Sequence, residues 1–313
     1  IEAIVARDDV RSVWLNRKLD YFNASSRQIT GVDKIQGAEF ANRNGGTEYT
    51  GKGVTIMVND SGIDATHQDL FFGDVVVDNV QAATHSLDLV ETGITDGFVI
   101  QGQPNTDLNV GHGTHCAGTI AGSGVMSDGK YKGVAPDADL VGYGSGAGLF
   151  ILDAVGGYDY AINHVYNYEH PLSIISNSSS RGLGYETGDF TMPDGTDCTY
   201  NNEVTIVAPG RYVISTRPST YMVANGNLAD SVIKPAYLSF YNRISGTSVA
   251  TPHAAGFVAL VMEANASLKI DKVKQLIKES ATNIPGYEAW EVGADYINMR
   301  AALAAKGFDN NQR

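Results

Sequence analysis

The sequence predicts an α/β fold with three layers, in which a mainly parallel β-sheet is covered by helices on both faces. From residue 29 onward, short apolar runs of strand length alternate with longer segments of helical periodicity. This alternation is typical of parallel strands joined by helical crossovers. At 313 residues, of which 43% are hydrophobic, the chain is long enough to bury one sizeable core.

The expected elements follow one another along the chain. Strands are predicted at residues 54–58, 75–80, 138–142, 172–177 and 204–207. Helices are predicted at residues 113–122, 149–168, 248–264 and 272–281. The last of these is amphipathic, because Val273, Leu276 and Ile277 recur at helical spacing. The stretch between residues 182 and 202 is turn-rich and polar.

The first 25 residues have a different pattern. Residues 1–7 and 10–19 alternate in a strand-like way, and residues 23–28 form a polar linker. We therefore expect residues 26–313 to form the main domain and residues 1–25 to be a separate segment. One interpretation of residues 1–25 is an ordinary N-terminal extension of the main domain.

Composition excludes several classes of partner. The net charge of -13 argues against a nucleic-acid partner, and no apolar run approaches the length of a membrane span. Neither the charge pattern nor the apolar residues require a partner protein, so a monomer is expected. The two cysteines, Cys116 and Cys198, do not make a disulfide framework. Cys116 is expected to be a small buried hydrophobic residue.

The most informative stretch is GTSVATPH, residues 246–253, which leads into an apolar run. It places Ser248 on a tight turn at the start of a helix. There, unpaired backbone N–H groups and the positive end of the helix dipole face any negative charge that develops beside the hydroxyl. This placement favours a nucleophile for acyl transfer. A serine hydroxyl is a weak nucleophile at neutral pH, so the interpretation requires a base and a group that orients the base.

Both groups are found earlier in the chain. His112 lies among glycines directly before a helical pattern, and Asp60 ends an apolar strand. Ligand sites of open α/β sheets lie beyond the carboxyl ends of the strands, so Asp60 is expected on the functional side. Metal binding by His112 and His115 is a weaker alternative, because no third ligand follows at a metalloprotease spacing.

With Asp60, His112 and Ser248 in this order, the chain resembles the subtilisin-like serine endopeptidases, or subtilases. The segments that carry the resemblance are VTIMVNDSGID at residues 54–64, GHGTHCAGT at 111–119 and GTSVATPH at 246–253. Cys116 is similar to the cysteine of the proteinase K branch. The resemblance implies a subtilisin-like fold and hydrolysis of peptide bonds. Ser248 would attack the carbonyl carbon, His112 would take and return its proton, and ionised Asp60 would orient the imidazole.

The resemblance also implies how a substrate binds. In subtilases the peptide adds as a strand between two segments of the enzyme, through backbone hydrogen bonds. The residues that resemble these two segments are Gly144, Ser145, Gly146, Ser178, Ser179 and Ser180. Because backbone contacts tolerate many side chains, an endopeptidase of broad specificity acting on proteins or peptides is expected.

Family resemblance further implies an extracellular enzyme that is made as a zymogen. Residues 1–25 are similar to the last strands of a subtilase propeptide, so the chain's own propeptide is an expected partner. Asp69, nine residues after Asp60, matches a position that often ligates a structural calcium ion in the family. Calcium takes six to eight oxygen ligands, and the rest of that site is not recognisable in the sequence. No cofactor is expected in the catalytic step.

One segment of the family pattern is missing. Subtilases carry an asparagine, downstream of the substrate strand, that donates a hydrogen bond to the oxyanion, and residues 182–202 are too few to hold it. A deletion, residues missing from this chain and a rebuilt loop are the three explanations. Missing residues are favoured, because deleting sheet strands would expose core. The Ser248 backbone N–H remains as an oxyanion donor, and a catalytically weak peptide-binding module is the alternative function. The substitute amides to consider are Asn177, Asn201 and Asn202.

Overall fold

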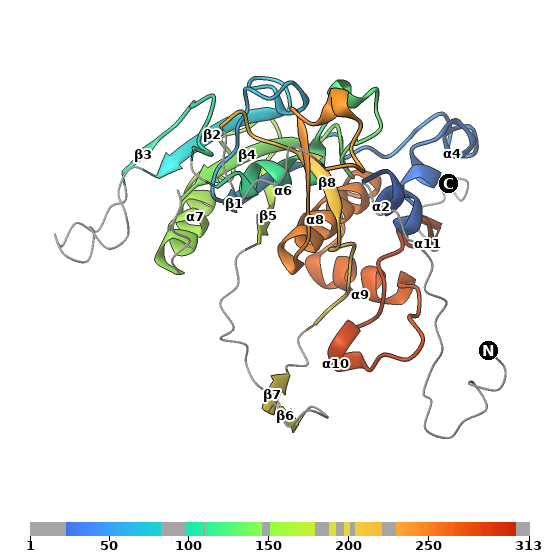
Figure 1. Cartoon of the computed structure of the whole chain (residues 1–313). Helices are drawn as coiled ribbons and strands as arrows, with labels where there is room; N and C mark the ends of the chain where they lie inside the picture. The colour runs from blue at the N-terminus through green and yellow to red at the C-terminus, as the bar shows by residue number, and fades with distance from the viewer. Residues whose placement is uncertain are drawn as a thin grey trace.

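The computed structural model describes residues 23–82, 98–108, 110–145, 151–178, 188–191, 197–200, 204–220 and 230–304. A five-stranded sheet of order β3-β2-β4-β1-β5 lies at its centre (Figure 1). Four strands run parallel, and the short edge strand β3 pairs antiparallel with β2. The strands are β1 (Thr55–Asp60), β2 (Val76–Ala82), β3 (Val99–Ile100), β4 (Asp139–Gly144) and β5 (Leu172–Asn177).

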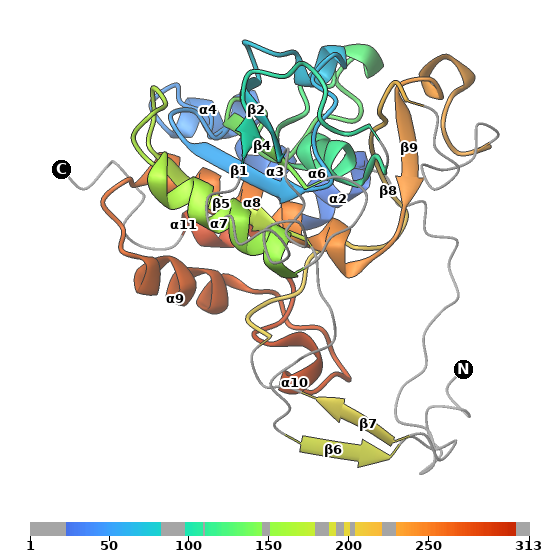
Figure 2. The same cartoon turned by 90° about the vertical axis from the view of Figure 1, so that its left-hand side faces the viewer.

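Helices cover both faces of this sheet. Alternate residues of β1 point to opposite faces: Ile56 and Val58 belong to the larger core cluster with α6 (His112–Ala121) and α8 (Thr247–Ala264). Met57, between them, belongs to a second cluster with α7 (Ile151–Asn163). Figure 2 shows α7 on the near face of the sheet and α8 beyond it. The predicted three-layer α/β fold is therefore confirmed.

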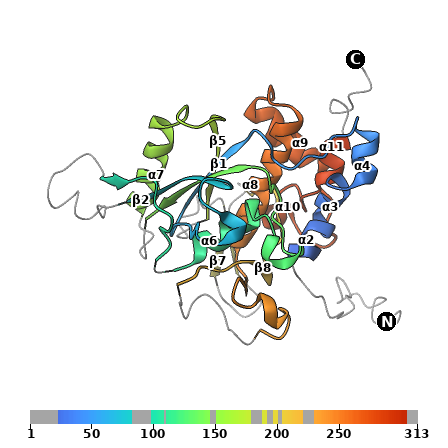
Figure 3. The same ribbon diagram turned by 90° about the horizontal axis from the view of Figure 1, so that it is seen from above.

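Shorter helices pack beside α8. At the C-terminal end, α9 (Ile270–Ser280) buries Val273 and Ile277, as its amphipathic pattern predicted. It contacts α11 (Met299–Ala304), which in turn contacts α3 (Val32–Ile35) near the start of the chain. Figure 3 shows these helices gathered on one side of the molecule. The described residues also contain the short helices α4 (Ala38–Arg43) and α10 (Ala289–Val292) and the 3₁₀ turns η1 (Gln68–Leu70), η2 (Val125–Ser127) and η4 (Pro235–Tyr237).

The prediction of a polar linker at residues 23–28 is wrong, because these residues are part of helix α2 (Asn23–Thr30). Its stability comes from tertiary contacts that its polar sequence does not reveal. The buried Arg27 donates to the Gly133 carbonyl, to Asp33 Oδ1 at 2.9 Å and to Gln36 Oε1 at 2.7 Å. The division of the chain at residue 25 stays a prediction, although α2 runs across that residue. Residues 1–22 lie outside the described residues.

Other differences are local. The crossover helix expected to reach residue 168 ends at Asn163, and α6 begins at His112 itself. Residues 204–207 do not join the sheet, because Val207 instead exchanges backbone hydrogen bonds with Asp295 and Ile297. Two antiparallel pairs were not expected: β6 (Gly188–Thr191) with β7 (Asp197–Tyr200), and β8 (Val213–Thr216) with β9 (Tyr241–Ile244). Within the described part of the chain, no helix is long and apolar enough to cross a membrane.

Candidate active site

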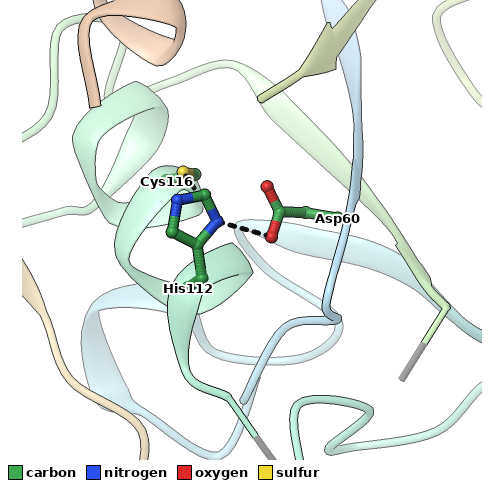
Figure 4. A group of neighbouring side chains, drawn as sticks. All are labelled: Asp60, His112 and Cys116. Atoms are coloured by element: carbon green, nitrogen blue, oxygen red, sulfur yellow. Dashed lines mark hydrogen bonds and ion pairs between the residues drawn. The ribbon is translucent and has the colours of Figure 1, made fainter. Parts of the chain in front are cut away.

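The structure brings together the side chains of Asp60, His112 and Ser248. Asp60 is the last residue of β1, His112 is the first residue of α6, and Ser248 lies in the first turn of α8. His112 Nδ1 is 2.7 Å from Asp60 Oδ1, and His112 Nε2 is 2.8 Å from Ser248 Oγ. Figure 4 shows the imidazole of His112 directed at the carboxylate of Asp60. Two hydrogen bonds therefore join the three groups in one line.

Glycine at position 113 permits this approach. A Cβ atom on Gly113 would lie 2.1 Å from the Gly62 carbonyl oxygen and 3.1 Å from the Asp60 Cβ. The start of α6 is thus in direct contact with the turn that follows β1. The Ser61 N–H donates to Asp60 Oδ1 at 2.7 Å, which fixes the carboxylate that faces His112.

The surroundings of His112 favour its charged form. Burial is the largest single effect and lowers the pKa of the imidazole. The hydrogen bonds with Asp60 and Cys116 and the charge of Asp60 together outweigh it, so the pKa lies above its ordinary value. The Asp60 side chain is 1% exposed, whereas that of His112 is 22% exposed. The base is therefore open to a substrate, and the carboxylate behind it is screened from water.

Cys116 lies one helical turn after His112 and is completely buried, as predicted. Its Sγ atom lies 3.9 Å from His112 Nδ1 and 3.5 Å from the Ser248 carbonyl oxygen. Burial raises the pKa of this free thiol, so it is neutral. Ligand atoms of Asp60, His112 and Cys116 lie within 4.8 Å of one another. A thiophilic metal ion that reached this group would therefore block the imidazole.

His115 and His253, in contrast, have structural roles. His115 is fully buried and its Nε2 faces the Val213 carbonyl oxygen at 3.2 Å. His253 is held between the Val249 carbonyl oxygen at 2.9 Å and Ser26 Oγ at 3.1 Å. Burial lowers the pKa of His115 to about 3 and that of His253 to about 4, so both are neutral. His115 is not part of the metal-capable group found among the described residues.

Three of the predicted substrate residues, Gly144, Ser145 and Ser178, lie at the ends of the two strands that flank β1. Gly144 ends β4, and Ser145 donates from both its N–H and its hydroxyl to the Asp60 carbonyl oxygen, at 3.1 and 3.0 Å. Ser178 follows β5, and its Oγ is 3.8 Å from Cys116 Sγ. Both segments thus border the Asp60, His112 and Ser248 group. Gly146, Ser179 and Ser180 lie outside the described residues.

Of the three amides considered as oxyanion donors, one lies among the described residues. Asn177 is the last residue of β5, whereas Asn201 and Asn202 lie outside the described residues. The Ser248 N–H lies at the start of α8, where the Gly246 N-cap offers no side chain. This backbone donor therefore lies beside the Ser248 hydroxyl.

The residues around Asp69 do not fit a calcium ion. Asp69 is fully buried, and each of its carboxylate oxygens already accepts a hydrogen bond. Oδ1 accepts from the Met126 N–H at 3.0 Å, and Oδ2 accepts from the Tyr241 hydroxyl at 2.5 Å. Burial raises the pKa of Tyr241, which keeps it a neutral donor. No group of three carboxylate, histidine or cysteine ligands surrounds Asp69 in the part of the chain that the structure describes.

Comparison with known proteins identifies relatives of this chain. A model of the subtilase family matches residues 51–198 and 194–307. The serine protease AprX of Bacillus subtilis (strain 168) is 27% identical over 366 residues, covering 94% of this chain and 74% of the relative. Subtilisin Savinase of Lederbergia lenta is 28% identical over 311 residues, covering 87% of this chain and 97% of the relative.

A solved structure shares the fold. Fervidolysin of Fervidobacterium pennivorans, a keratinolytic enzyme related to subtilisin, superposes with a TM-score of 0.54 at 20% identity. The match covers 87% of this chain and 45% of fervidolysin, so this chain corresponds to less than half of that protein. The two family matches overlap at residues 194–198, within residues 182–202, where the sequence lacks the expected oxyanion asparagine, and the AprX alignment is longer than this chain. The chain therefore belongs to the subtilase family of serine endopeptidases.

Proposed function

We propose that Ser248, His112 and Asp60 hydrolyse internal peptide bonds through an acyl-enzyme. The observation that carries this proposal is the line of two hydrogen bonds from Ser248 Oγ through His112 to Asp60, at 2.8 and 2.7 Å. A hydroxyl, an imidazole and a carboxylate joined in this way are what nucleophilic attack by serine requires.

Each residue has one task in this mechanism. Ser248 Oγ attacks the carbonyl carbon while His112 Nε2 takes its proton, and the imidazolium then donates that proton to the leaving amine. Asp60 holds the Nδ1–H tautomer and stabilises the imidazolium. The N–H of Ser248 at the start of α8 stabilises the oxyanion. A water molecule, deprotonated by His112, then releases the acyl group from Ser248.

We propose a broad specificity and a secreted enzyme made as a zymogen. The ends of β4 and β5 lie on either side of β1, which suits a peptide that binds mainly through its backbone. Secretion and a propeptide are supported by the family alone. If a propeptide is removed, cleavage before residue 26 would keep Ser26 and Arg27, whose contacts hold α2 on the domain.

A catalytically weak peptide-binding module is the second candidate, favoured by the absence of the usual oxyanion asparagine. Loss of one oxyanion donor lowers kcat by about 10² to 10³, or about 3 to 4 kcal/mol. A single backbone donor at Ser248 would therefore leave a slow enzyme. Peptide mapping between residues 178 and 204 tests whether further residues are present there.

Hydrolysis of denatured casein separates the two candidates. The wild-type protein is expected to release soluble peptides. Ser248→Ala is expected to lower turnover by about 10⁶, the loss measured when subtilisin itself is deprived of its nucleophilic serine. Ser267→Ala is the matched control, because Ser267 is an exposed serine after α8 whose hydroxyl bonds only Asn265. If the wild-type protein binds casein and releases no peptides, the result would contradict the endopeptidase and support the peptide-binding module.

A further inference from the structure

A second buried carboxylate, Asp107, lies between the segments that carry Asp60 and His112. Asp107 is fully buried and takes no part in the proton path from Ser248. It comes from the loop that precedes α6, and its two oxygens accept four hydrogen bonds. These bonds reach the turn after β1 on one side and the first turn of α6 on the other.

On the β1 side, the contact runs through Ser61. The Ser61 hydroxyl donates to Asp107 Oδ1 at 3.0 Å and accepts from the Gly113 N–H at 2.9 Å. The N–H of the same Ser61 donates to Asp60 Oδ1 at 2.7 Å. The residue that fixes the Asp60 carboxylate is therefore itself held by Asp107.

On the α6 side, Asp107 binds the residues that bracket His112. Its Oδ1 accepts from the Gly111 N–H at 2.7 Å, and its Oδ2 accepts from the Thr114 N–H at 3.0 Å and the Thr114 hydroxyl at 2.6 Å. Gly111 is the N-cap of α6 and has no side chain to cap the helix. Asp107 thus caps α6 from outside and places a negative charge at the positive end of its dipole.

We propose that Asp107 is a positioning residue that sets the distance between the Asp60 carboxylate and the His112 imidazole. This inference rests on the proposed function of the Asp60, His112 and Ser248 group. The Asp107 carboxylate holds both partners of the His112–Asp60 hydrogen bond. It holds Asp60 through Ser61, and it holds the start of α6, which carries His112, through Gly111. A displacement of about 1 Å at a reacting group costs up to about 10² in rate, so this anchor acts on turnover.

The charge of Asp107 is needed for all four contacts. Every group that faces it is a donor, so the ionised carboxylate satisfies them all. Each oxygen accepts from one backbone N–H, Gly111 on Oδ1 and Thr114 on Oδ2. In Asp107→Asn, the amide NH₂ must therefore face one of these two N–H groups, whichever way the side chain is turned. One end of the anchor is then lost.

The chain offers a closely matched control in Asp64. Asp64 is also fully buried, and each of its oxygens also accepts from one backbone N–H and one hydroxyl. Oδ1 binds both groups of Thr66, and Oδ2 binds both groups of Ser219. Asp64→Asn therefore suffers the same loss of charge and the same amide conflict, at a carboxylate that does not hold Ser61 or Gly111.

The experiment compares the two variants by kcat, by KM and by the low-field proton resonance of the His112 Nδ1–H. We expect both variants to lose similar stability. For Asp107→Asn, kcat is expected to fall by about 10- to 100-fold with KM within about twofold, and the resonance to shift or broaden. For Asp64→Asn, kcat and the resonance are expected to match the wild type. Equal kcat and an unchanged resonance in Asp107→Asn would overturn the inference.

A milder variant decides the matter if Asp107→Asn does not fold. Ser61→Ala removes the hydroxyl that links Asp107 to Gly113 and keeps the N–H that binds Asp60. We expect kcat to fall by about 3- to 10-fold with the same change in the His112 resonance, and wild-type values would reject the proposal. If the wild type itself lacks hydrolysis that depends on Ser248, the proposed function fails instead.

Discussion

Gly113 offers a direct test of how Asp60 and His112 are brought together. It follows His112 in α6 and packs against the turn after β1. In Gly113→Ala the new methyl carbon would lie 2.1 Å from the Gly62 carbonyl oxygen. Because that neighbour is backbone, it cannot rotate away. The start of α6 and the β1 turn must therefore separate by about 1 Å to restore ordinary van der Waals contact.

A separation of this size breaks the hydrogen bond between His112 and Asp60. Their nitrogen and oxygen atoms lie 2.7 Å apart, and an extra distance of about 1 Å takes them beyond the limit of about 3.2 Å for such a bond. A misplacement of about 1 Å costs about 10² in rate, and loss of the oriented imidazole tautomer costs about 10⁴. We expect kcat to fall between these limits while KM changes less than about threefold, because the new methyl group meets Gly62 and Asp60 and not the ends of β4 and β5.

The assay is hydrolysis of a chromogenic peptide, with active sites counted by titration. Gly37→Ala is the control, because Gly37 has a φ of -120° and a Cβ there would meet only the Asp33 carbonyl oxygen, at 3.3 Å. That variant should keep wild-type kcat. A folded Gly113→Ala protein with more than about a tenth of wild-type kcat would refute the contact argument.

Three further predictions concern neighbouring groups. His112 must be neutral to act as a base and its pKa is raised, so kcat/KM should fall as the pH is lowered, with a midpoint above 6.5. The midpoint should move to lower pH in Asp60→Asn, and an unchanged midpoint would contradict the role of His112 as the base beside Asp60. Tyr241→Phe should lower the free energy of unfolding by about 1.5 to 3 kcal/mol, because it removes a hydrogen-bond donor from the buried Asp69 carboxylate. An unchanged free energy of unfolding would contradict this role of Tyr241. Mercurials should inactivate the wild type through Cys116 and spare Cys116→Ala, and equal inactivation of both would place the reactive group elsewhere.

The elements that hold the catalytic group were predictable from sequence. β1, α6 and α8 are each defined by a local apolar pattern, and glycine-containing turns join them to Asp60, His112 and Ser248. The parallel order of the strands then indicated that Asp60 emerges at the ligand-binding edge. Local pattern and chain order were sufficient here, because the signals lie within about ten residues of each side chain.

Features that depend on distant partners were not predictable. Helix α2 has a polar sequence, and its contacts reach Gly133 and Gln36 through Arg27. The pairing of β8 with β9 joins segments that lie far apart in the sequence, Val213–Thr216 and Tyr241–Ile244. Asp107 is one polar residue among several before His112, and its role appears only when Ser61 is brought beside it. Asp69 matched a calcium position, but its oxygens bond Tyr241 and Met126 instead.

The most direct test of the catalytic claim is reaction of the folded protein with a phosphonofluoridate, followed by mass analysis of its peptides. We predict one adduct per molecule, located on Ser248, because the hydrogen bond to His112 activates the Ser248 hydroxyl as a nucleophile. His112→Ala should slow its formation to the rate of an ordinary serine. An unlabelled Ser248 in a protein that hydrolyses casein would contradict the account.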